Sequence, residues 1–155
     1  MSSCKGMKMK RLILTASALV GLSGCAIHQQ VQPLPSVASR EICIIENNEV
    51  RGGFLRAYQD ALSSKNYVIR VLPPQSALDS CLLTSTYTAN WRWDLALYMA
   101  YADITVYRNG QVYGNARYDA KRGSANMNKF IDADQKIAEL VNELYPSGYL
   151  YRAMP

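Results

Sequence analysis

The order of a strand, a helix and a second strand between residues 42 and 72 constrains the fold more than any other feature of the sequence. Residues 42–45 (ICII) form a short apolar run of the length typical of a buried strand. Between residues 50 and 65, apolar side chains recur at helical spacing with charged residues between them. Residues 67–72 resume a strand pattern and end at a double proline. Because strand–helix–strand crossovers are almost always right-handed, we expect two parallel strands and a helix on their sheet.

Three further strands and a closing helix are predicted after Cys81. Residues 83–92 and 95–107 are rich in Thr, Tyr and other β-formers, and Asn109-Gly110 is a strong hairpin turn before a return strand over residues 111–119. Apolar residues between 131 and 144 recur at helical spacing. The predicted order is β-α-β-β-β-β-α, an α+β fold with one mixed, mostly antiparallel sheet and two helices packed on one face.

Two registers are open at the Asn109-Gly110 turn. A two-residue loop pairs Arg108 with Gln111, and in a regular hairpin it would turn Arg117 and Asp119 toward the apolar face. A three-residue loop, with Gly110 left-handed, pairs Tyr107 with Gln111 and gathers apolar side chains on one face. Because burying unpaired charges is costly, we predict the three-residue loop.

In that register one face of the sheet stays open, and its amphipathic rings suit an interface. For any single tyrosine the alternative is ordinary half-buried packing on the sheet. The candidate partner face consists of Tyr101, Asp103, Tyr107, Tyr113 and Arg117.

The first 25 residues have the pattern of an export signal. Basic residues at 5, 8, 10 and 11 precede an apolar run over residues 12–22, which is shorter than the ~20 residues that span a bilayer. Leu22-Ser23-Gly24-Cys25 resembles the lipobox of bacterial lipoproteins, which implies cleavage before Cys25 and its modification with fatty acyl chains such as palmitate. In the proteobacterial lipoproteins an Asp after this Cys favours the inner membrane. Ala26 stands there, so the resemblance implies the outer membrane, with the domain facing the periplasm.

These signals divide the chain into four parts. Residues 1–24 are predicted to be a removed signal peptide, and 25–40 a lipidated cysteine with a flexible tether rich in Gln, Pro and Ser. Residues 41–146 are predicted to form the periplasmic α+β domain, and 147–155 a C-terminal tail.

Cys43 and Cys81 are the other two thiols that remain after cleavage. In an exported chain such a pair is expected to form a disulfide, and the alternative is two buried thiols. No Cys-x-x-Cys motif indicates a redox role.

Few residues or motifs of the chain suit catalysis or cofactor binding. The single histidine, His28, falls in the predicted tether, so we expect no His-dependent triad and no metal site, and no motif indicates a cofactor. Without the four basic residues near the N-terminus the chain has 13 basic and 12 acidic residues, which argues against nucleic acid as a partner. The folded region has scattered carboxylates, two of which could meet as a glycosidase pair: Asp94, Asp103, Asp119, Asp132 and Asp134.

The run from Tyr101 to Pro146 resembles the C-terminal half of a family of small proteobacterial lipoproteins of uncharacterised function. The matching features are Tyr118-Asp119-Ala120 at the end of a hairpin and Lys129-Phe130 before the closing helix. This resemblance transfers no catalytic residue.

Three hypotheses follow. The first is a non-enzymatic outer-membrane lipoprotein whose domain binds another envelope component, either a protein or a glycan. The second is a carboxylate enzyme on envelope carbohydrate that uses Asp103 and Asp119. The third is a structural lipoprotein that forms homo-oligomers.

Overall fold

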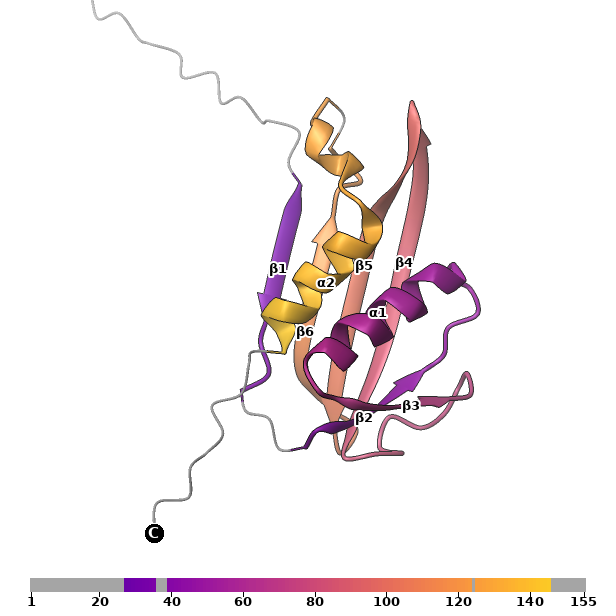
Figure 1. The fold of residues 1–155 in the computed structure, drawn as a ribbon, viewed down its shortest axis with the longest axis vertical. Coiled ribbons are helices and arrows are strands. Elements are labelled where there is room, and N and C mark those ends of the chain that lie inside the picture. Colours follow the sequence, from indigo (N-terminus) through magenta and orange to yellow (C-terminus); the bar gives the residue numbers. More distant parts are fainter. Residues whose placement is uncertain (1–26, 36–38, 124, 146–155) are drawn as a thin grey trace, which may run out of the picture.

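The computed structural model describes residues 27–35, 39–123 and 125–145, which form one six-stranded sheet and two α-helices (Figure 1). The predicted signal peptide, Cys25 and the tail over 147–155 lie outside these residues. The elements in chain order are β1 (His28–Gln32), β2 (Glu41–Ile45), α1 (Gly52–Ser64), β3 (Val68–Leu72), β4 (Leu83–Asp94), β5 (Ala96–Arg108), β6 (Gln111–Asp119), the 3-10 helix η1 (Met127–Phe130) and α2 (Ala133–Leu144).

The strands lie in the order β1-β6-β5-β4-β2-β3. β2 is parallel to both β3 and β4, and the other neighbours are antiparallel. The α+β class, the mixed sheet and the parallel pair flanking α1 are therefore confirmed. None of the helices in the described ranges is long and apolar enough to cross a membrane.

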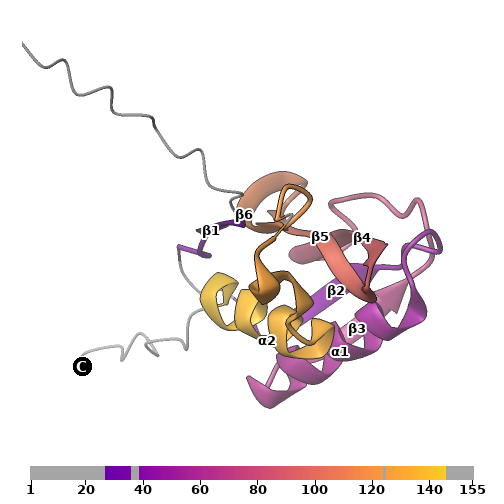
Figure 2. The ribbon, with the colours of Figure 1, turned by 90° about the horizontal axis from the view of Figure 1, so that it is seen from above.

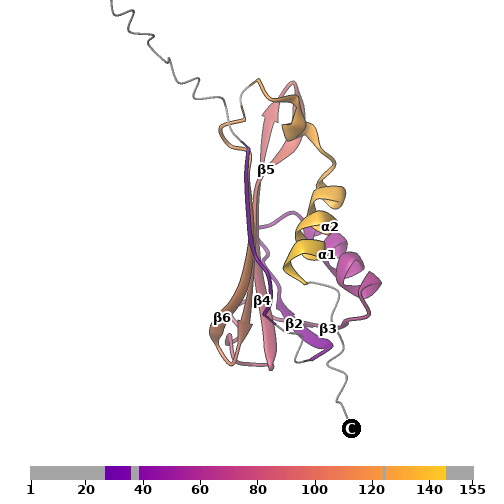
Figure 3. The ribbon, with the colours of Figure 1, turned by 90° about the vertical axis from the view of Figure 1, so that its left-hand side faces the viewer.

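Both helices lie side by side on one face of the sheet, as Figures 2 and 3 show. α1 turns Phe54, Tyr58 and Leu62 toward the sheet, and α2 turns Ile137 and Leu140 in the same direction. Most of the charged residues between them stay outside because helical periodicity separates the two sets, and Lys136 of α2 is buried. The core is therefore confined to the space between the sheet and its two helices.

The disulfide between Cys43 and Cys81 is present, with the two Cα atoms 6.1 Å apart. It joins β2, a strand inside the sheet, to the segment just before β4. The predicted pairing is confirmed.

The predicted tether is partly wrong, because it contains a strand. Residues 28–32 form β1, which pairs antiparallel with the edge of β6, so that Gln29 lies opposite Tyr118 and Val31 opposite Ala116. Leu34 follows as a buried core residue, and its N–H donates to the carbonyl of Leu144 at 2.9 Å. Pairing with an available sheet edge overrides the weak strand propensity of a Gln-rich segment. The folded unit therefore begins before residue 41.

The predicted hairpin register is wrong, although its assignment of faces holds for Gly114, Ala116 and Tyr118. Val112, expected on the apolar face, instead pairs with Tyr107 and is exposed. Arg108 pairs with Gln111 across a two-residue loop in which Asn109 and Gly110 both have positive φ, the conformation of a type I′ turn. The register then shifts between Val106 and Tyr107, so that Val106 lies opposite Gly114. This bulge adds one residue, Tyr113, to β6 and restores Gly114, Ala116 and Tyr118 to the helix side.

Candidate functional site

The candidate surface is the side of the sheet that no helix covers (Figure 3). Along β5 and β6 alternate residues point to this side, because side chains in a strand alternate between faces. We call this surface the tyrosine face and define it by Tyr101, Asp103, Thr105, Tyr107, Asn115 and Arg117. Its two tyrosines are half-buried and Arg117 is exposed. Four of the five predicted partner residues lie on this surface. The fifth, Tyr113, is the extra residue of the bulge in β6; it packs against the core cluster, with the Arg108 guanidinium 5.4 Å from its ring centre.

Asp103 is the buried centre of the tyrosine face. Its carboxylate accepts hydrogen bonds from Arg117 Nε at 2.7 Å, Asn115 Nδ2 at 2.9 Å and Thr105 Oγ1 at 3.0 Å. Tyr101 donates a longer bond of 3.3 Å to the same carboxylate. Because both carboxylate oxygens are satisfied, these residues are held in fixed positions. Asp103 supports the surface from below rather than presenting its charge to a partner.

The charges of this surface are fixed over the ordinary pH range. Burial, together with the nearby Asp103 carboxylate, raises the pKa of Tyr101. The hydrogen bond and the charge of the same carboxylate raise the pKa of Arg117. Tyr101 is therefore neutral and Arg117 cationic over this range. The face presents aromatic rings, hydroxyl groups and one exposed guanidinium group.

The other acids considered for catalysis are separated along the fold. Asp119 forms an ion pair with Lys121 at 3.4 Å, and Asp94 pairs with Lys129. Asp132 caps the start of α2 by accepting from the Gln135 N–H at 3.0 Å, and Asp134 is exposed in its first turn. Asp103 and Asp119 lie on neighbouring strands, yet each is engaged by its own cation.

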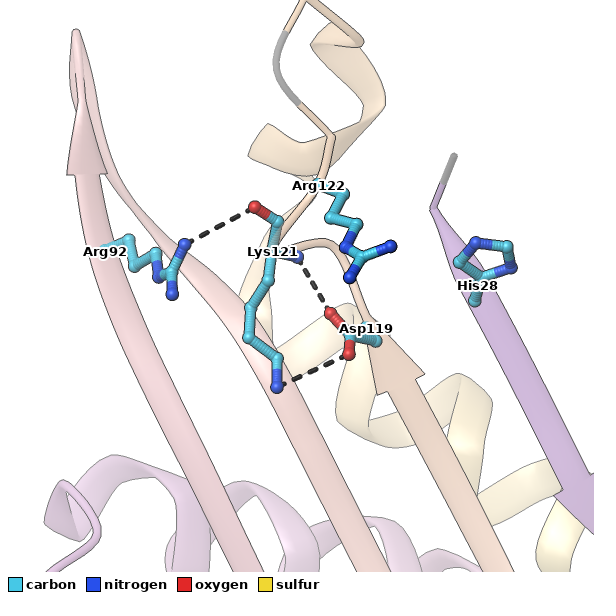
Figure 4. Close-up of a pocket in the computed structure, with 5 residues that line it drawn as sticks. All are labelled: His28, Arg92, Asp119, Lys121 and Arg122. Atoms are coloured by element: carbon cyan, nitrogen blue, oxygen red, sulfur yellow. Dashed lines mark hydrogen bonds and ion pairs between the residues drawn. The ribbon is translucent and has the colours of Figure 1, made fainter. Parts of the chain in front are cut away.

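A basic pocket of about 490 Å³ lies at the end of β6, next to the tyrosine face (Figure 4). Arg92 of β4 donates to the Lys121 carbonyl at 3.4 Å, and the Lys121 ammonium lies 4.2 Å from the centre of the Tyr101 ring. Arg122 and His28 complete the wall. Sequence reasoning missed this pocket because His28 reaches it only through β1, a strand that the sequence pattern did not predict.

A second cavity, of about 370 Å³, lies beyond the end of β2 and is lined by Glu46, Glu49 and Tyr87 among others. The Tyr87 hydroxyl there accepts from the backbone N–H of Asn47 at 3.2 Å. Across the described parts of the chain, no three His, Cys, Asp or Glu side chains are grouped so that they could hold a metal ion.

Comparison with known proteins yields a fold relationship. No protein-family model and no curated protein sequence matches the chain. The solved structure of a PelC dodecamer from Paraburkholderia phytofirmans superposes with a TM-score of 0.54 at 11% identity, covering 76% of this chain and 98% of that chain. A variant PelC dodecamer from the same organism superposes with a TM-score of 0.50 at 10% identity, covering 77% and 94%. At such low identity the comparison shows a shared fold.

Proposed function

We propose that this chain is an outer-membrane lipoprotein, anchored through Cys25, whose periplasmic domain is a non-enzymatic binding module for another envelope component. The anchor is supported by the basic N-terminus, the short apolar run and the lipobox Leu22-Ser23-Gly24-Cys25. Two or more acyl chains on one cysteine are sufficient for stable membrane attachment.

The tyrosine face carries the proposal of a binding role. Tyrosine rings are common in interfaces because they bury apolar area while keeping a hydrogen-bonding hydroxyl group. Here they stand on a sheet in which Thr105, Asn115 and Arg117 are fixed by Asp103. A surface that is already ordered loses little conformational entropy when a partner docks, which favours binding. Aromatic rings and fixed polar groups can bind either a protein surface or a glycan.

The arrangement of the acids argues against the carboxylate-enzyme hypothesis. A glycosidase needs two carboxyl groups facing each other across a bond, one of them able to donate a proton. Asp103 is occupied by donors, and Asp119 is held by Lys121. Asp103 and Asp119 therefore support structure and do not face each other as a catalytic pair.

Self-association is a second candidate function. The fold is shared with PelC, which forms a dodecamer. In the described sheet, β1 and β3 are edge strands. Repeated contact between two different surfaces of one chain closes into a ring when the rotation permits. Light scattering on the mature domain measures this directly, and a monomer at every concentration would exclude it.

Two measurements test the binding proposal in its parts. Mass spectrometry of membrane-extracted protein should find Cys25 as the acylated first residue, and an unmodified chain in the soluble periplasm would contradict the anchor. Crosslinking in intact cells should capture a partner that is lost with Tyr107→Ala. The matched pair Arg117→Ala and Arg56→Ala compares two exposed arginines, one on the tyrosine face and one on α1. If the two variants captured the partner equally well, the tyrosine face would not be the binding surface.

A further inference from the structure

The hairpin between β4 and β5 ends in a set of exposed apolar side chains. Trp93 and Leu97 pair across the hairpin and are 75% and 53% exposed, and Leu95 between them is 82% exposed. Met127 of η1 is 69% exposed. An edge-to-face contact between Tyr98 and Phe130, at 5.5 Å, and the Asp94–Lys129 ion pair hold η1 against the hairpin. We call Trp93, Leu95, Leu97 and Met127 the apolar tip.

Leu95 has a backbone conformation that leucine seldom adopts. Its φ is +61°, in the left-handed region that favours Gly and Asn. Strained residues cluster at functional sites, and this one holds the most exposed of the large apolar side chains that the structure describes. The turn therefore presents leucine at the tip against the preference of its backbone.

The apolar tip and the start of the described chain lie at the same end of the molecule, the upper end in Figure 1. His28, the first residue of β1, pairs with Asp119 at the end of β6. In the sequence only Ala26 separates Ile27 from Cys25. Two Cα–Cα steps of about 3.8 Å each therefore set the greatest distance between the lipid-bearing residue and the folded domain.

Cationic groups lie beside the apolar tip. Arg92, Lys121 and Arg122 are exposed around the basic pocket, against the single carboxylate of Asp119 (Figure 4). The acid at the tip, Asp94, is paired with Lys129, and the start of α2 is set back from this end (Figure 3). Tryptophan and leucine side chains flanked by Arg and Lys are the combination that binds the boundary between lipid headgroups and acyl chains.

We infer that this end of the domain docks directly on the membrane surface, with the apolar tip inserted among the lipids and the basic pocket against anionic headgroups. The inference uses the proposed anchor at Cys25 only for its orientation. The short connection places the bilayer at this end, and the exposed apolar side chains then leave water. In this position the sheet stands on the membrane with the tyrosine face turned to the side, where a partner can reach it.

The test uses the mature chain with Cys25→Ser, so that binding cannot arise from the lipid. Vesicles of phosphatidylethanolamine and phosphatidylglycerol should co-sediment with it. In a Trp91→Phe background, Trp93 is the only tryptophan left, and its emission should move to shorter wavelength on binding. Leu95→Asn with Leu97→Ser should weaken partitioning by about tenfold or more, because two apolar side chains are lost from the lipid contact.

Matched variants separate this role from folding. Asn suits the left-handed backbone at residue 95, so Leu95→Asn alone should fold at least as stably while binding less. Val112→Ser removes an exposed apolar side chain next to the opposite hairpin turn and should bind as the parent chain does. Arg92→Gln with Arg122→Gln should weaken binding to phosphatidylglycerol vesicles but not to phosphatidylcholine vesicles.

Absence of vesicle binding, or an unchanged Trp93 emission, would overturn the inference. It would also be overturned if the tip variants altered self-association and left vesicle binding unchanged. Because the assay needs neither lipidation nor a partner, its failure is distinct from a failure of mass spectrometry or crosslinking.

Discussion

Arg117 of β6 lies directly opposite Asp103 of β5, and its Nε donates a 2.7 Å hydrogen bond to a carboxylate that is almost fully buried. The guanidinium group is itself half exposed. The Arg117 side chain therefore contacts both the buried carboxylate of Asp103 and the solvent. The pair explains how an acid can lie within this surface without being available to a ligand.

Removing Asp103 should destabilise the fold more than removing an exposed acid. Asp103→Ala removes the carboxylate that accepts from Thr105 Oγ1 and Arg117 Nε, whereas Asn115 keeps other acceptors, and we expect a loss of about 1–3 kcal/mol in the free energy of unfolding. Asp119→Ala breaks the more exposed pair with Lys121 and should cost about 0–1 kcal/mol. Urea unfolding followed by circular dichroism measures both, and equal losses would contradict the role given to Asp103.

The buried tyrosines should make the fold sensitive to alkaline pH. Tyr58 and Tyr145 are fully buried and share a 2.6 Å hydrogen bond, and burial raises the pKa of both hydroxyls. Above pH ~10 the unfolded chain releases tyrosine protons that the folded chain retains, so the free energy of unfolding should fall as pH rises. Below that pH these two hydroxyl groups should not make the free energy of unfolding depend on pH. Tyr58→Phe should make the alkaline decline shallower in urea titrations at several pH values, and an unchanged slope would exclude this cause.

Gly114 should not tolerate a side chain. A Cβ there would lie 2.6 Å from Leu34 Cδ2 and 3.1 Å from Leu144 Cδ1. Gly114→Ala should therefore destabilise the fold by about 1–3 kcal/mol through overpacking. The control is Gly53→Ala in α1, where a Cβ meets nothing within 4 Å and where alanine favours the helix by about 1 kcal/mol. In a Leu34→Ala background, Gly114→Ala should cost less than it does in the parent chain if the clash is its cause. Thermal unfolding of the variants ranks them.

Loss of the Cys43–Cys81 disulfide should lower the free energy of unfolding by about 2–5 kcal/mol, because the crosslink restricts the unfolded chain. The variant that replaces both cysteines by alanine should match the parent chain under reducing conditions. Thiol alkylation of the denatured, unreduced chain should label neither residue. Labelling of both would show that the bridge does not form in the protein as isolated.

The sequence pattern predicted the elements whose signals are local. The helical spacing of Phe54, Tyr58 and Leu62 and the short apolar run 42–45 each carry their periodicity within a few residues. Parallel pairing of β2 with β3 followed from the crossover alone.

The elements that the sequence pattern did not predict depend on distant parts of the chain. β1 is a strand because the edge of β6 is available to it, not because Gln29 and Gln30 favour strands. The bulge beside Tyr107 is the second case. Asn109 and Gly110 both adopt the positive φ that a two-residue turn requires. The extra residue in β6 then shifts the register, so that apolar side chains still point toward the helices. The basic pocket could not be predicted without β1, because His28 is one of its walls.

The pairing of β1 with β6 also has a mechanical consequence. A pull applied at Ile27 along the strand axis would load the five residue pairs between β1 and β6 together in shear, not one after another. Leu34 follows β1 in the chain and resists the same pull, because its side chain is buried and its N–H is hydrogen-bonded to the Leu144 carbonyl. If tension reaches the domain through its N-terminus, the hydrogen bonds between β1 and β6 would bear the force together. They would have to break before the force reaches the core.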